Sequence, residues 1–197
     1  MYMEINGTAN SRKKAGFALL MTLIVVGAVA AIGISVLDLS LKQVQLSTNA
    51  KDSEIAFHAA NAGMECARYI RRIASSTMEA GGAINPSCFS VSPSSNDIYQ
   101  VTTGVTGNGT VTFYKYQFSW GTSPRCTVIQ TLVLNATAGQ SGLNLSGVDD
   151  WIEGYPLDNK ACAAGERCTV ISTKGWNRSC VNITSVGTVQ REVLLQF

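Results

Sequence analysis

The hydrophobic positions of this chain follow three successive patterns. An apolar run without a charged residue covers the 21 residues from Phe17 to Leu37. In the proline-free segment 38–80, apolar residues recur every three or four positions, which indicates a helix. From residue 81 onward they gather in short stretches separated by Gly, Pro, Ser and Asn. The patterns predict an α+β chain in which a long N-terminal helix precedes a β-rich domain.

The helix is expected to run from about Phe17 to about Met78, with Gly81 and Gly82 ending it. The charged residues Arg68, Arg71 and Arg72 lie mainly off its expected packing face. That face is formed by Ile55, Ala59, Ala62, Cys66, Tyr69 or Ile70, and Ile73, with Phe57, Ala60 and Met64 in a flanking stripe.

The later segment predicts an antiparallel sheet, with the C-terminal half of the helix packed on one face. Thr106–Gly109 contains Asn-Gly and predicts a hairpin turn, and Gly121–Pro124 predicts a second turn. The expected strands are Ile98–Thr103, Thr110–Trp120, Cys126–Ala136, Cys168–Thr173 and Thr188–Phe197.

The apolar run is long enough to cross a bilayer, since 21 helical residues span roughly 30 Å. Arg12, Lys13 and Lys14 precede it, so the positive-inside rule places the N-terminus in the cytoplasm. Three interpretations are open. The run is a secretory signal cleaved near Ala28–Ala30, a plain single-pass anchor, or a helix retained after cleavage at Gly16.

Composition argues against several other classes of protein. The 197 residues carry a net charge of only +2, without the basic face that nucleic-acid binding needs, so no nucleic-acid partner is expected. The single histidine, His58, leaves one candidate base for triad catalysis, and we expect it to be a polar position beside a packing face. No metalloprotease, phosphate-loop or nucleophile-elbow motif occurs, so we expect neither an enzyme nor a cofactor.

The six cysteines, an even number, indicate an oxidising compartment. Fifteen pairings are possible, and the sequence does not select one. Short loops favour Cys66–Cys88 and Cys162–Cys168, which leaves Cys126 with Cys180. A zinc site is disfavoured, because the spacings are not those of close Cys pairs and export disfavours thiolates.

Four acidic residues, Asp149, Asp150, Glu153 and Asp158, gather in a loop with Gly154 and Pro156. Their oxygen atoms suit Ca²⁺, although the spacing is not that of an EF-hand. A solvated acidic loop without a metal is the simpler interpretation.

The Ala15-Gly16 pair before the apolar run resembles the class III signal of type IV prepilins. The resemblance implies that a prepilin peptidase cuts after Gly16, methylates Phe17 and leaves the apolar helix in place. It also implies that this helix assembles with other pilin subunits and with inner-membrane lipid. Its candidate assembly residues are Phe17, Leu20, Leu23, Ile24, Val26 and Leu37.

Residues 56–69, AFHAANAGMECARY, resemble the PilX-like N-terminal family of minor pilins. Most major pilins carry Glu as the fifth residue after the cut, whereas Met21 stands there in this chain. A subunit without that Glu makes a poor repeating unit but can occupy a filament end or a low-copy position.

The resemblance implies four segments: a leader (1–16), a transmembrane and assembly helix (17–37), an extended amphipathic helix (38–80) and a disulfide-braced exported domain (81–197). The expected function is that of a minor pilus or pseudopilus subunit, which caps or assembles a filament and exposes its β-rich domain at the cell surface. The alternative is a single-pass, membrane-anchored extracellular binding domain that does not polymerise.

Overall fold

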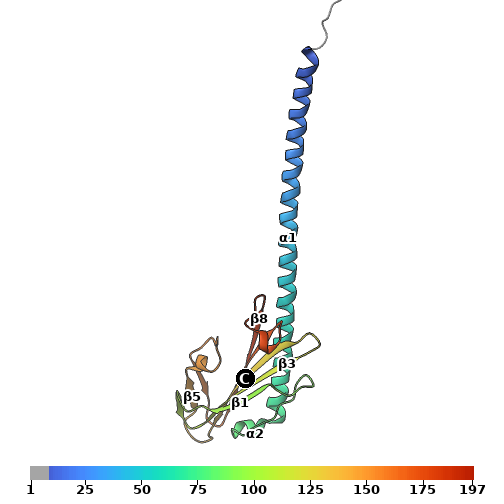
Figure 1. Ribbon diagram of the computed structural model, residues 1–197. Coiled ribbons are helices and arrows are strands. Elements are labelled where there is room, and N and C mark those ends of the chain that lie inside the picture. Colours follow the sequence, from blue (N-terminus) through green and yellow to red (C-terminus); the bar gives the residue numbers. More distant parts are fainter. Residues whose placement is uncertain (1–8) are drawn as a thin grey trace, which may run out of the picture. The chain divides into compact units, whose positions relative to one another are not determined.

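The computed structural model describes residues 9–197, and their side chains from residue 16 onward (Figure 1). The chain divides into two compact units, one ending at Asn49 and the other covering Ala50–Phe197. Helix α1, Ala9–Ile73, contributes residues to both units. The predicted fold class is confirmed: a long apolar N-terminal helix belongs to the same chain as an antiparallel sheet on which its later part packs.

The helical limits differ from those predicted. Helix α1 begins before Phe17, since residues 9–16 contain no proline to prevent helix formation. It ends at Ile73, and a separate short helix, α2, covers Ser75–Glu79. Between them Ala74 leaves helical geometry, with φ −110° and ψ 24°. The serines that follow it favour helix ends over helix interiors.

The main sheet contains five antiparallel strands in the order β1-β3-β4-β7-β8. All five predicted strands are confirmed to within a few residues, and residues 121–124 form the turn between β3 and β4. Their bounds are β1 Ser95–Gln100, β3 Gly109–Trp120, β4 Arg125–Ala136, β7 Arg167–Trp176 and β8 Gln190–Gln196.

A second sheet, which the sequence did not predict, consists of β2 (Val105–Gly107), β5 (Leu143–Ser146) and β6 (Asn159–Cys162) in the order β2-β5-β6. The prediction of a hairpin turn at Thr106–Gly109 is wrong, because the strands on either side of it do not pair with each other. Strand β2 pairs with β5, whereas β3 pairs with β1 and β4, so the Asn-Gly pair marks the passage from one sheet to the other.

Alternating side chains of the main sheet build two large cores, one on each face, and a smaller third cluster gathers around Cys126, Val128 and Trp176. The second sheet and the 3₁₀ turn η1 (Val148–Asp150) cover one face, where Phe113 and Leu134 are buried. Helices α1 and α2 cover the other face, where Tyr116 and Ile129 are buried. Both faces of β3, β4 and β7 are therefore shielded from water: β4 and β7 are almost continuously buried, and so is the middle of β3, whereas the ends of β3 are partly exposed.

The contact between α1 and the sheet is made by small residues. Ala56, Ala59 and Ala60 are fully buried against β4 and β7. Thr127 Oγ1 donates a hydrogen bond to the carbonyl of Ala59 at 3.1 Å, and Thr173 Oγ1 donates one to that of Ala60 at 2.9 Å. Sheet side chains reach the helix backbone because no large helix side chain intervenes.

The predicted packing face of α1 is turned by about one position relative to the observed one. Tyr69 and Ile73 are 53% and 64% exposed, and Phe57 of the flanking stripe also faces solvent. Ala59, Ala60, Met64 and Ile70 are buried as predicted, and Ala56, Gly63 and Ala67 join them. The smallest side chains, rather than the largest apolar ones, therefore mark the buried face.

Substitution of Gly175 by Ala tests this close approach. A Cβ there would collide with backbone atoms of Ala56, Ala59 and Ala60. We expect Gly175→Ala to lower the free energy of unfolding by about 3 kcal/mol in urea titrations of the full chain in a non-ionic detergent.

The matched control is Gly139→Ala, where a Cβ would meet nothing within 4 Å. Its φ of 73° limits the expected cost to about 1 kcal/mol. Equal losses in the two variants would contradict the proposed close packing.

Candidate functional site

The apolar assembly segment of α1 makes no contacts that bury it within the described chain. Its six candidate residues are between 56% and 69% exposed: Phe17, Leu20, Leu23, Ile24, Val26 and Leu37. The most apolar 18-residue window of the helix has a mean hydropathy of 2.7, and none of it is buried. A surface of this kind requires lipid or other apolar helices around it. It is compatible with a single-pass membrane anchor.

Gly16 and Phe17 are consecutive residues of α1, at the start of this surface. A Cβ placed on Gly16 would meet no atom of the described chain within 4 Å. Gly63 differs, because a Cβ there would collide with Thr127. The fold of this chain therefore gives no reason for glycine at position 16.

A buried ion network lies where α1 gives way to α2. The Glu79 carboxylate accepts a hydrogen bond from Arg71 Nη2 at 2.8 Å, and its other oxygen forms an ion pair with Arg167 Nε, on β7, at 3.0 Å. Arg71 Nε also donates to Thr169 Oγ1 at 3.0 Å. The side chains of Arg71 and Glu79 are only 9% and 10% exposed, so each charge depends on the other for compensation.

The backbone around Glu79 is held by the sheet as well. Its carbonyl accepts from Asn135 Nδ2 at 3.2 Å and from Thr110 Oγ1 at 3.4 Å. Tyr114 Oη donates to the carbonyls of Met78 and Gly82, both at 3.1 Å, and burial raises the pKa of this phenol. This network was not predicted, because the helical periodicity of the sequence places Arg71 off the packing face, whereas in the structure Arg71 is buried.

All six cysteines are paired, as Cys66–Cys88, Cys126–Cys180 and Cys162–Cys168. These are the three pairs that the short-loop argument favoured. The first ties α1 to the segment after α2, and the second ties β4 to the 3₁₀ turn η2 (Cys180–Asn182). By loop-closure entropy they contribute about 3 and about 4 kcal/mol, against about 2 kcal/mol for the short Cys162–Cys168 loop.

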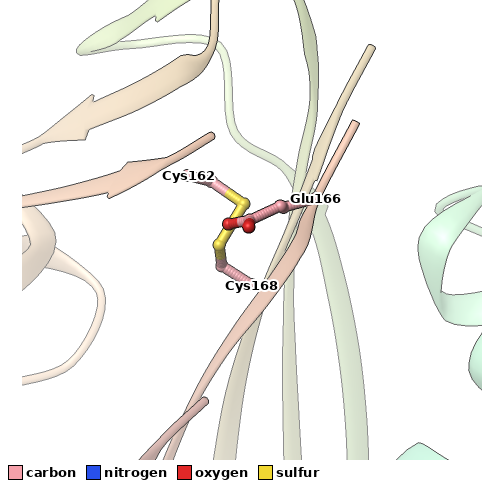
Figure 2. A group of neighbouring side chains, drawn as sticks. All are labelled: Cys162, Glu166 and Cys168. Carbon is pink, nitrogen blue, oxygen red and sulfur yellow. A yellow bond between two sulfur atoms is a disulfide. The ribbon is translucent and has the colours of Figure 1, made fainter. Parts of the chain in front are cut away.

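One group of potential metal ligands is found within the described residues, at Cys162, Glu166 and Cys168 (Figure 2). Figure 2 shows the two sulfur atoms bonded to each other, with the Glu166 carboxylate beside them. Disulfide sulfurs are not thiolates, and thiolates are the form in which cysteine binds zinc. As oxidised here, the group braces the end of β6 against the start of β7.

The four candidate calcium ligands do not come together. In the part of the chain that the structure describes, Asp149, Asp150, Glu153 and Asp158 form no group of three with ligand atoms within 4.8 Å of one another. Glu153 instead accepts from Lys174 Nζ at 2.7 Å. That hydrogen bond and the lysine charge lower the pKa of Glu153. The loop carries η1 and covers the main sheet, which its sequence spacing did not reveal.

His58 lies on the exposed side of α1, and its Nε2 is 3.6 Å from Glu54 Oε1. Among the described residues it has no hydrogen bond to a serine, threonine or cysteine. This geometry does not assemble a histidine-dependent nucleophile.

No protein-family model matches this chain, and no curated protein or solved structure matches it. The residues and contacts described above are therefore the grounds on which a function is proposed.

Glu79 offers a direct test of the ion network. We expect Glu79→Gln to lower the free energy of unfolding by about 3 kcal/mol, because it leaves the buried Arg71 charge uncompensated. The measurement is urea unfolding followed by circular dichroism.

Glu65→Gln is the matched control, since Glu65 pairs with Arg68 at 3.2 Å on the exposed surface. We expect it to cost less than about 1 kcal/mol. A Glu79→Gln loss no larger than that of the control would show that the network does not hold α2 in place.

Proposed function

We propose that this chain is a minor subunit of a type IV pilus or a related pseudopilus. It is inserted with its N-terminus in the cytoplasm, cut after Gly16 and held in the membrane by residues 17–37 until assembly. The observation that carries the proposal is the uncovered apolar surface of α1, which begins directly after a glycine that the fold does not require.

The uncovered surface supports assembly for a physical reason. Residues 17–37 are apolar on every side of the helix, so no polar face would be left toward water. Lipid satisfies such a helix before assembly, and helices of neighbouring subunits satisfy it afterwards. The fold itself does not require glycine at position 16. In this proposal the glycine is needed instead by the prepilin peptidase, which must approach the backbone closely at the cut.

Met21 supports a minor rather than a major position. It is 49% exposed on the same apolar surface, at the place where major pilins carry the Glu that pairs with a neighbour's N-terminal amine. Without this carboxylate the amine of an adjoining subunit remains unpaired in an apolar environment, which is costly when repeated along a filament. A single or terminal copy avoids most of that cost.

The unit from Ala50 to Phe197 is the exported part, consistent with its three disulfides. Its role is surface interaction, and no catalytic role is proposed for it. In a filament this unit projects from the helical bundle and is available to ligands.

A second candidate is a membrane-anchored extracellular binding domain that never polymerises. The absence of Glu at Met21 also favours this candidate, because polymerisation through the usual pairing is then unavailable. The two candidates differ in the fate of residues 1–16, which the anchor keeps and the pilin loses.

Substitution of Gly16 by Leu tests the proposal in the native host. We expect the variant to accumulate as an unprocessed precursor, heavier than the mature chain by its leader, and to be absent from sheared surface filaments. The measurement is intact mass of the membrane fraction together with immunoblotting of the sheared fraction.

Gly33→Leu is the matched control, because a Cβ at Gly33 also meets nothing within 4 Å and the residue lies beyond the proposed cut. It should be processed normally. Normal processing of Gly16→Leu would refute the proposal.

A further inference from the structure

A groove of about 830 Å³ opens on the exported unit, beside the ion network. It is lined by the last turns of α1, by α2 and by the edge of the sheet formed by β7 and β8. Its size falls within the usual range of small-molecule sites. All of its lining residues lie between Glu65 and Phe197, within one compact unit.

The side chains of this groove carry an excess of positive charge. Four guanidinium groups, those of Arg68, Arg71, Arg72 and Arg167, face two side-chain carboxylates. Both carboxylates are already engaged: Glu65 pairs with Arg68, whereas Glu79 is shared by Arg71 and Arg167.

Two arginines therefore have unused donors. Within the described residues Arg72 is exposed and has no acidic oxygen within 4.0 Å. Arg167 uses Nε for Glu79, which leaves its two terminal nitrogens, and its side chain is 63% exposed. Arg71 and Arg72 also complement the negative end of the α1 dipole, but Arg167 lies on a strand and does not.

The remaining wall of the groove is apolar and aromatic. Tyr69 and Phe197 are 53% and 58% exposed, and Leu195 also lines the groove. Exposed aromatic side chains beside free guanidinium groups suit a ligand that has an anionic end and an apolar body.

The unused donors decide which anion fits best. Arg72 and Arg167 each present guanidinium N–H groups that no carboxylate of the described side chains engages. A phosphate monoester has three strong acceptor oxygens and can accept from both guanidinium groups, whereas a carboxylate has only two oxygens. The forked guanidinium donors also match the oxygens of a phosphate group.

We propose that this groove binds a phosphate monoester with an aromatic or aliphatic body. The phosphate lies between Arg72 and Arg167, and the body lies against Tyr69 and Phe197. The proposal does not depend on pilus assembly, since every residue it uses belongs to the exported unit.

Isothermal titration calorimetry of the full chain in a non-ionic detergent, at constant ionic strength, tests the proposal. The probes are phenyl phosphate, inorganic phosphate and benzoate. Phenyl phosphate should bind tightest, inorganic phosphate more weakly because it lacks the body, and benzoate most weakly because its carboxylate offers only two acceptor oxygens to the two arginines. Benzoate binding as tightly as phenyl phosphate, or no binding of either phosphate, would overturn the proposal.

Arg72→Gln is the decisive variant, because Arg72 has no partner whose loss could disturb the fold. We expect it to weaken phenyl phosphate binding about tenfold, the effect of removing one charged hydrogen-bond donor. Arg125→Gln is the control, because Arg125 lies far from the groove along the sheet. It is the first residue of β4, whereas Arg167 of the groove pairs with Asn135 near the other end of that strand. Equal weakening in both variants would reduce the binding to non-specific attraction and refute the site.

A further titration distinguishes a lipid from a soluble source of the phosphate. Dihexanoyl phosphatidic acid presents the same phosphate monoester on an aliphatic body, as a lipid headgroup would. Binding tighter than that of phenyl phosphate supports the site and assigns a lipid source, whereas weaker binding that still depends on Arg72 supports the site and assigns a soluble aromatic phosphate. Binding that Arg72→Gln leaves unchanged would count against the groove.

Discussion

The close contact between α1 and the main sheet is the constraint on which the rest of the unit Ala50–Phe197 depends. Small side chains at Ala56 and Ala60, facing Gly175 on β7, allow the backbones to approach until sheet threonines bond to helix carbonyls. The helices cover only one face of the sheet, so the core on the opposite face needs a separate cover. The small sheet and the turn η1 serve that purpose, so both faces of three strands are buried.

The same helix offers two different surfaces to two different surroundings. After Asn49 one face of it is buried by its own chain, whereas residues 17–37 have no partner within the described chain. A helix of this kind joins a folded unit to a segment whose apolar surface must be covered by lipid or by other protein chains. The buried network at Glu79 holds the end of this helical region to β7, so that α2 and the segment tied by Cys66–Cys88 keep their place.

The fold class and the five main strands could be predicted, because β3, β4 and β7 are long and rich in β-branched and aromatic residues. The second sheet could not, because β2, β5 and β6 are only three or four residues long and carry no sustained alternation. The buried face of α1 was misplaced because large apolar residues such as Ile73 were given more weight than alanines. Arg71 was missed because its partner Glu79 becomes its neighbour only when the helix breaks at Ala74.

The central claim is that residues 17–37 of α1 are retained after cleavage at Gly16 and serve assembly. Mass spectrometry of the N-terminal peptide, on protein from the native membrane and surface fractions, tests it most directly. The account predicts a mature chain that begins at Phe17 and carries one added methyl group on its N-terminal amine. A chain that still begins at Met1, or one that begins within or beyond the apolar run, would contradict it.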